Sequence, residues 1–157
     1  MRGKKAPKRK ILPDSRFNRV DIHKFINQVM RAGKKTVAEK IVYGAFDLVK
    51  EKSKKDPLQI FDQAIKKITP QMEVRTRRVG GAHYQIPFPV RGTRQQTLAF
   101  RWLISAARSG KGKPMKEKLA SELLLAAQGE GAAIRKKEDV HKMAESNKAF
   151  AHFAKFG

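Results

Sequence analysis

The stretch Met72–Pro89, MEVRTRRVGGAHYQIPFP, differs in pattern from the rest of the chain. β-Branched and aromatic residues flank Gly80-Gly81, which is typical of a hairpin with a two-residue turn. Neither face of this hairpin is apolar enough to lie on a core, and an isolated hairpin is marginal in water. The sequence therefore predicts a projecting arm that a partner steadies, with a short flap against the helices as the alternative. The turn fixes four cross-strand pairs: Arg75–Ile86, Arg77–Tyr84, Arg78–His83 and Val79–Ala82.

Helical periodicity dominates the sequence on both sides of this arm. Asp56 and Pro57 form a clear helix start, an N-cap residue followed by proline at the first helical position. The pattern predicts a mainly α fold: a single domain of about six helices, with the two-stranded arm between the third and fourth helices. The expected helices span about 20–31, 35–52, 57–68, 93–109, 115–128 and 132–147.

Apolar spacing also assigns the inner faces of these helices. Trp102 lies at the centre of the fourth helix, and we expect it in the core rather than as a stacking platform. The tail, residues 148–157, is predicted to dock either on the body or on a partner protein through Phe150, Phe153 and Phe156. The expected inner residues include Val37, Ile41, Ala45 and Leu48 in the second helix, and Val140, Met143 and Ala144 in the sixth.

Net charge indicates the class of partner. The 157 residues include 36 Lys and Arg against 14 Asp and Glu, a formal net charge of +22. The hydrophobic fraction of 40% still allows a core, which argues against a wholly disordered basic tail. No run is apolar enough to span a membrane, no secretory segment follows the basic start, and a chain without cysteine forms no disulfide. We expect an intracellular folded domain whose surplus charge a polyanion neutralises.

Nucleic acid is the polyanion that this charge distribution favours. A membrane-binding protein would concentrate its basic and large apolar residues on opposite faces of one helix. Here the basic residues recur from Arg2 to Lys155, which suits a long polyphosphate that touches several faces. A solvated basic surface without a specific partner is the alternative.

Candidate contacts fall in six basic segments. The basic N-terminal arm, residues 1–19, is expected to become ordered on phosphate, and a solubility tail is the alternative reading. Three arginines spaced by seven share one face of the fourth helix. The predicted contacts are Arg2, Lys4, Lys5, Lys8, Arg9, Lys10, Lys34, Lys35, Arg75, Arg77, Arg78, Arg94, Arg101, Arg108, Lys111, Lys113, Arg135, Lys136, Lys137 and Lys142.

Catalytic patterns are weak in this sequence. No histidine pair has metal-binding spacing, and no nucleophile elbow or dinucleotide fingerprint occurs. An enzyme acting on nucleic acid would have to use a pair such as Glu73 with His83, which spacing does not support. We therefore expect no enzyme activity, no cofactor, no metal and no small-molecule substrate.

Six stretches resemble the family of bacterial-type small-subunit ribosomal protein seven. The resemblance covers nearly the whole chain in order, and RRVGGAHYQIP and RKKEDVHKMAESNKAFAH are its most specific segments. The matching stretches are Lys10–Asn18, Phe25–Asp47, Asp56–Ile65, Glu73–Pro87, Leu98–Arg108 and Leu119–Phe153.

The resemblance implies a structural protein of the small ribosomal subunit, in the cytoplasm or in an organelle. It implies binding to the 3′ major domain of small-subunit rRNA and an early role in assembly of the head. Neighbouring head and platform proteins would be partners, with exit-site tRNA and mRNA near the arm. It adds Arg91 to the rRNA contacts, among which we also predict Lys116, and it assigns Arg78, Gly80, Gly81, His83 and Tyr84 to the side near tRNA and mRNA.

The chain departs from the family pattern at two places. Phe88-Pro89 stands where the family often has valine and glutamate, and Gln95-Gln96 stands where it often has two arginines. These changes concern rRNA contacts at the base of the arm. Two other hypotheses remain open at this point, a general nucleic-acid chaperone or DNA-packaging protein and an RNA-processing enzyme.

Overall fold

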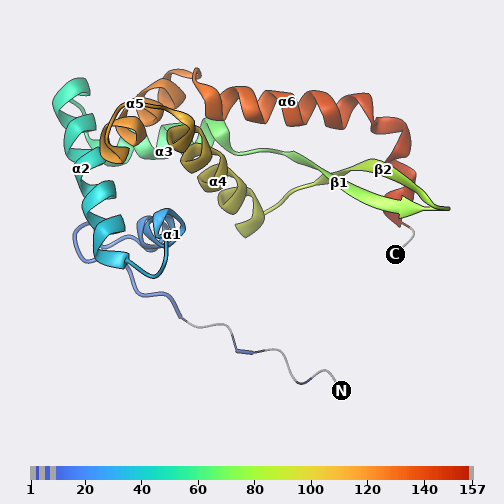
Figure 1. The fold of residues 1–157 in the computed structure, drawn as a ribbon, viewed down its shortest axis with the longest axis horizontal. Helices are drawn as coiled ribbons and strands as arrows, with labels where there is room; N and C mark the ends of the chain where they lie inside the picture. The colour runs from blue at the N-terminus through green and yellow to red at the C-terminus, as the bar shows by residue number, and fades with distance from the viewer. Residues whose placement is uncertain (1–2, 4–5, 8–9, 156–157) are drawn as a thin grey trace.

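A computed structural model of the chain describes residues 3, 6–7 and 10–155 (Figure 1). In this part of the chain, six α-helices, one two-stranded antiparallel hairpin and a terminal 3₁₀ helix follow one another. The elements are α1 (Val20–Val29), α2 (Lys35–Ser53), α3 (Pro57–Ile68), β1 (Met72–Val79), β2 (Ala82–Pro89), α4 (Thr93–Ser109), α5 (Met115–Gln128), α6 (Ala132–Ser146) and η1 (Lys148–Lys155).

The helices α1 to α5 form a body from which the hairpin projects. Figure 1 shows the two strands leaving the body at one side, with α6 running above them in the same direction. The chain then turns back, so that η1 packs on β2 while α6 packs on β1 and α4. The projecting arm that the sequence predicts is therefore confirmed, but α6 and η1 pack on it, so the alternative of a flap against the helices is also met in part.

Phenylalanine rings join the helices of the body. Phe61 of α3 lies 5.3 Å from Phe25 of α1 and 5.6 Å from Phe46 of α2, measured between ring centroids. Phe100 of α4 lies 5.1 Å from Phe25, and Phe17 lies 5.4 Å from Phe46. The pairs meet edge to face, the arrangement that aromatic quadrupoles favour. One ring from each of four helices thus forms the centre of the core.

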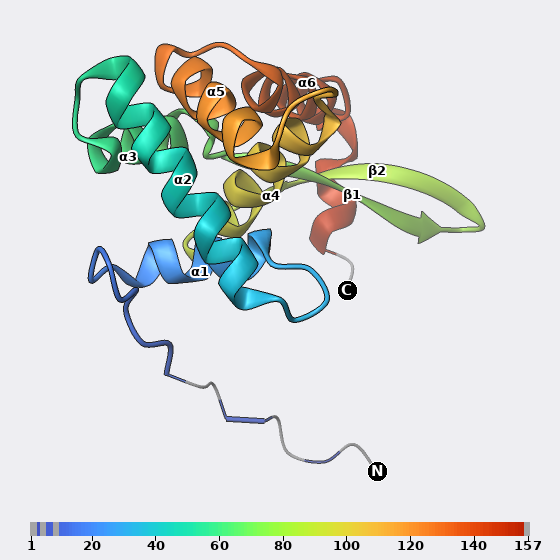
Figure 2. The same ribbon diagram turned by 60° about the vertical axis from the view of Figure 1, so that its left-hand side comes forward.

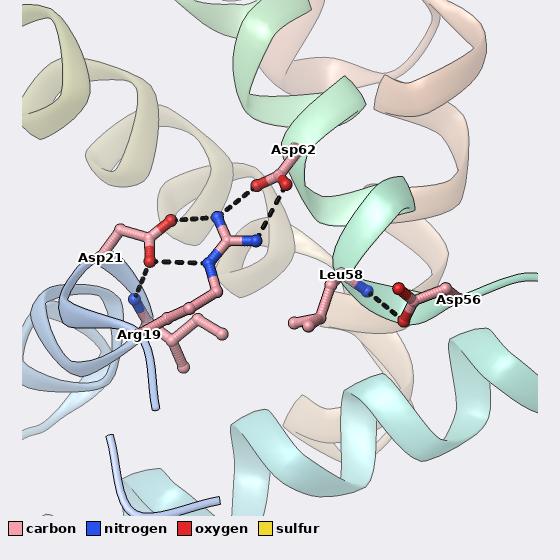
Figure 3. A network of polar contacts seen from close by, with 6 residues as sticks. Arg19, Asp21, Asp56, Leu58 and Asp62 are labelled. Atoms are coloured by element: carbon pink, nitrogen blue, oxygen red, sulfur yellow. Dashed lines mark hydrogen bonds and ion pairs between the residues drawn. The ribbon is translucent and has the colours of Figure 1, made fainter. Parts of the chain in front are cut away.

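An ion-pair network fixes the start of α1 to α3 (Figure 3). Arg19, the residue before α1, donates to Asp21 over 3.0 Å and to Asp62 of α3 over 2.9 Å. Hydrogen bonds to Asp62 and then Asp21 raise the pKa of Arg19. At the N-terminus of α3, the Asp56 carboxylate accepts the Leu58 backbone N–H over 3.1 Å and caps the helix as the sequence predicts.

The turn from α5 to α6 depends on two glycines and a buried carboxylate. Gly129 and Gly131 have φ of +98° and +97°, a region that other residues rarely adopt. The Glu122 carboxylate of α5 accepts the Ala133 backbone N–H over 2.8 Å at the start of α6. A Cβ atom at residue 131 would lie only 2.8 Å from that carboxylate. Glycine is therefore required here both for conformation and for space.

Helix bounds agree closely with the sequence, but two buried faces do not. The bounds of α4 and α5 are those predicted, whereas α1 ends two residues earlier than expected. In α2, Ala38 and Val42 are buried while Val37 is 50% exposed. Two adjacent apolar stripes of α2 fit helical spacing, one that begins at Val37 and one that begins at Ala38. Packing against α5 buries the second stripe, whereas the sequence analysis chose the first. Met143 of α6 is 39% exposed because this half of α6 extends past the body.

The arm has the predicted register but a more buried base than predicted. All four expected pairs occur, and pairing continues to Met72 opposite Pro89. Glu73 and Ile86 are buried at the base, so the expectation that neither face meets a core is wrong there. Farther out, the Tyr84 ring lies 5.2 Å from the Phe150 ring of η1. The tail thus docks on the protein's own arm; Phe156 and the Phe153 side chain lie outside the described residues.

Two matched substitutions separate the body from the arm. Phe61→Ala opens a cavity in the core, so we expect the free energy of unfolding to fall by about 3–5 kcal/mol in urea titrations. Phe150→Ala removes the contact of the tail with Tyr84 and should change the free energy of unfolding by less than about 1 kcal/mol. Amide exchange in β2 should nevertheless become faster in Phe150→Ala. An unchanged β2 exchange rate would contradict the role of the tail in holding the arm.

Candidate nucleic-acid interface

A buried carboxylate anchors the base of the arm to the body. Glu73 of β1 accepts hydrogen bonds from Arg94 of α4 over 2.9 and 3.1 Å, and it pairs with Arg75 on its own strand. Its side chain is only 7% exposed. Burial alone would raise the pKa of Glu73, but the hydrogen bonds from Arg94 and Arg75 outweigh it and lower this pKa. Arg94, a predicted rRNA contact, therefore also holds the arm at a fixed angle.

One face of the arm carries two arginines over one aromatic ring. The guanidinium carbon of Arg75 lies 5.2 Å from the Phe88 ring centroid, and that of Arg77 lies 5.7 Å from it. Cations over a ring face are attracted by its quadrupole. Phe88, one of the departures from the family pattern, thus supports two cations of the arm and directs them together along one face.

Three arginines line a polar hollow between α1 and α4. Arg101 and Arg108 of α4 and Arg31, which follows α1, border a concavity of about 790 Å³ whose other lining residues include no carboxylate. Arg108 donates to the Val29 carbonyl over 3.0 Å. Burial, and then the nearby charge of Arg31, lower the pKa of Arg108. Like charges held together without a described counter-ion make this hollow suited to an anion such as phosphate.

The remaining predicted contacts are distributed over several faces. Lys137 donates to the Lys67 carbonyl over 2.6 Å, and Lys35 lies 3.2 Å from the ring of His23, so both have partners inside the protein. Tyr84 lies against Phe150 and is half-buried. Arg2, Lys4, Lys5, Lys8 and Arg9 lie outside the described residues. Exposed are Lys10, Lys34, Arg78, Gly80, Gly81, His83, Arg91, Lys111, Lys113, Lys116, Arg135, Lys136 and Lys142.

Two residues of the candidate interface, Arg31 and His141, are not among the predicted contacts. Arg31 joins the hollow of α4, and its position just before Lys34 and Lys35 was the available signal. His141 of α6 accepts the Gln71 backbone N–H over 3.2 Å, immediately before β1. Burial, and then the charge of Lys137, lower the pKa of His141, which keeps its ring nitrogen available as an acceptor. His141 thus ties α6 to the base of the arm.

The candidate catalytic pair is separated by the register of the arm. Glu73 lies opposite Phe88, whereas His83 lies opposite Arg78 near the tip. Five strand residues at about 3.3 Å each place the two side chains roughly 17 Å apart. In the ranges that the structure describes, no group of three His, Asp or Glu could hold a metal ion. Likewise, none of the helices in those ranges is long and apolar enough to cross a membrane.

Comparison with known proteins identifies the family. The model of the family "Ribosomal protein S7p/S5e" matches residues 1–148. This chain belongs to that family. The resemblance that RRVGGAHYQIP and the other stretches carry is therefore confirmed.

Relatives in the S7p/S5e family match almost end to end. The small ribosomal subunit protein uS7 of Thermotoga maritima is 57% identical over 153 residues, which cover 98% of this chain and 99% of the relative. The protein of the same name from Pelotomaculum thermopropionicum is 58% identical over 148 residues, covering 94% of this chain and 95% of the relative. That of Teredinibacter turnerae is 55% identical over 152 residues, or 97% of each chain.

The buried anchor at the base of the arm can be tested through pH. Glu73→Gln should lower the free energy of unfolding by about 1–3 kcal/mol at pH 7, because two arginines lose a charged acceptor. A lowered pKa gives stability that is present above the ordinary value of 4.5 and is lost as pH falls through the folded pKa. The difference between wild type and Glu73→Gln, measured by urea unfolding, should therefore shrink in acid.

Asp47→Asn is the matched control for this test. Asp47 pairs with Arg16, but the two side chains are 59% and 44% exposed. Exposed pairs contribute little, so we expect a change below about 1 kcal/mol. A Glu73→Gln variant no less stable than Asp47→Asn would contradict the anchoring role of Glu73.

Proposed function

We propose that this protein is a structural component of the small ribosomal subunit and binds the 3′ major domain of small-subunit rRNA. On this proposal it nucleates assembly of the head. Its arm lies near exit-site tRNA and mRNA, and other head and platform proteins are its neighbours. Membership of the S7p/S5e family and relatives named small ribosomal subunit proteins support this proposal.

The observation that carries the proposal is the hollow of Arg31, Arg101 and Arg108. These cations converge on one concave surface, and no carboxylate lines it. Repulsion among these three cations lowers the stability of the free protein, and phosphates that enter the hollow would remove this repulsion. Exposed cations on the arm and on α6 form a second positively charged region, outside the body.

Binding would combine neutralisation of RNA phosphates by the basic side chains with recognition of the shape of the folded RNA. Phosphate contacts fix the position of a protein on RNA, whereas unpaired nucleotides and groove shape select the site. Glu73 and His141 hold the arm in a fixed direction from the body, so body and arm can meet two separate RNA segments at a set distance. Such a two-part contact suits the junctions of a folded rRNA domain better than a uniform duplex.

A binding titration tests this function directly. The ligands are a transcript of the 3′ major domain and an unrelated RNA of equal length, at several salt concentrations. We expect preferential binding of the domain transcript that persists as salt rises, although affinity falls steeply if about 6–10 phosphates are engaged. Equal binding to both RNAs would leave only a general chaperone, and cleavage or modification of the RNA would indicate an enzyme.

The arm can be tested by removing its central cations. Arg77→Ala combined with Arg78→Ala should weaken binding of the domain transcript. The slope of the logarithm of the binding constant against the logarithm of the salt concentration should become shallower by about one to two. The helical circular-dichroism signal should be unchanged because the arm projects from the body. Lys54→Ala with Lys55→Ala, two exposed cations after α2, is the control and should bind like wild type. Loss of helical signal in the arm variant would contradict the projecting-arm structure.

A further inference from the structure

A second concavity adjoins the arginine hollow and has a different character. It lies between the end of α1, the start of α2 and the start of α5, and it has a volume of about 440 Å³. Figure 2 shows α1 crossing the lower end of α2, where the chain between them loops out. Val37, Ile41, Met30 and Met115 provide an apolar floor and walls. Val37, half exposed on a helix whose other valines are buried, faces this cleft.

The rim of this apolar cleft is entirely cationic. Its charged lining residues are Arg31, Lys34, Arg108 and Lys118, and no carboxylate is among the lining residues. Lys118 donates to the Gly110 carbonyl over 2.9 Å and Arg108 to the Val29 carbonyl, so both cations are held by neutral groups. An occupant that matches this cleft must therefore be apolar at its centre and anionic at its edge.

The two concavities share Arg31 and Arg108. Both arginines line the polar hollow on the α4 side and the apolar cleft on the α2 side. A strand of RNA whose phosphates lie in the polar hollow would therefore pass directly beside the apolar cleft. Methionine sulfur makes favourable contacts with aromatic rings, and Met30 and Met115 border the cleft. The volume falls in the range of small-ligand sites, which accommodates one nucleoside and excludes a duplex.

We propose that this cleft takes one unpaired nucleotide of the bound RNA, with its base against Val37 and its phosphate between Arg31 and Arg108. The inference rests on the proposed function and adds to it a site of base recognition. Folded RNAs expose such nucleotides in loops and bulges, where a base leaves its stack to contact protein. An acidic peptide would match the rim, but it would leave the adjoining arginine hollow without an anion.

Val37→Asn tests this site, with Val20→Asn as its matched control. Both valines are exposed, by 50% and 41%, and both lie in the first turn of a helix. Val37→Asn should weaken binding of the 3′ major domain transcript by roughly 5–10-fold, since one apolar base contact is lost. Its salt dependence should equal that of wild type because no phosphate contact is removed. Val20→Asn should change affinity by less than about twofold.

Chemical probing of the same transcript gives a second readout. One unpaired base that wild type protects should become reactive in the Val37→Asn complex, while protection elsewhere persists. If Val37→Asn binds and protects like Val20→Asn, the inference is overturned. If it does so but enters reconstituted subunits poorly, the cleft holds a protein segment instead, which also overturns it.

The two proposals fail separately in this experiment. Loss of preference for the domain transcript in the wild-type protein would contradict the proposed function. A selective defect of Val37→Asn on any single-stranded RNA would still support the nucleotide site. Normal preference in wild type together with an unaffected Val37→Asn variant would leave the proposed function intact and remove the site.

Discussion

A chain with 36 lysines and arginines but only 14 aspartates and glutamates must fold against the repulsion of its own cations. Repulsion among the cations opposes folding, so the position of each acid matters. Half of the acids act within the fold: they cap helices, accept buried backbone N–H groups or pair arginines across elements. These seven are Asp14, Asp21, Asp47, Asp56, Asp62, Glu73 and Glu122. These acids pair with groups elsewhere in the fold, and no carboxylate is among the described residues that line the hollow of α1 and α4, so RNA phosphate can supply its counter-ion.

The arm depends on the body more than an isolated hairpin would suggest. Glu73 ties it to α4, His141 ties its base to α6, and Phe150 packs against it farther out. The free protein thus presents an arm that is already oriented before RNA binds. Preorganisation lowers the entropy that binding must overcome. A fixed arm also sets the distance between its contacts and those of the body, which a flexible tail of equal charge would not do.

Local signals predicted the elements, and tertiary contacts decided the rest. Asp56, the Gly80-Gly81 pair and Gly129 act through nearby backbone, so helix starts, turn and register follow from the sequence. The buried face of α2 does not, because two stripes fit its periodicity and the packing of neighbouring helices selects one. The arginine hollow needs α1 beside α4, so Arg31 was missed. The tail was recognised as a docking segment, but Tyr84, on which Phe150 packs, lies more than sixty positions away in the chain.

Directed cleavage from single cysteines tests most directly whether RNA lies on a defined face. The chain has no cysteine, so Ser105→Cys in the arginine hollow and Lys55→Cys after α2 each carry one tethered cleavage reagent. The length of α2, about 28 Å at 1.5 Å per residue, separates Lys55 from the α1–α2 loop that carries Arg31. In a complex with the 3′ major domain transcript, position 105 should give strong, localised cleavage and position 55 little. Equal, diffuse cleavage from both would mean that charge alone binds the RNA, and it would contradict this account.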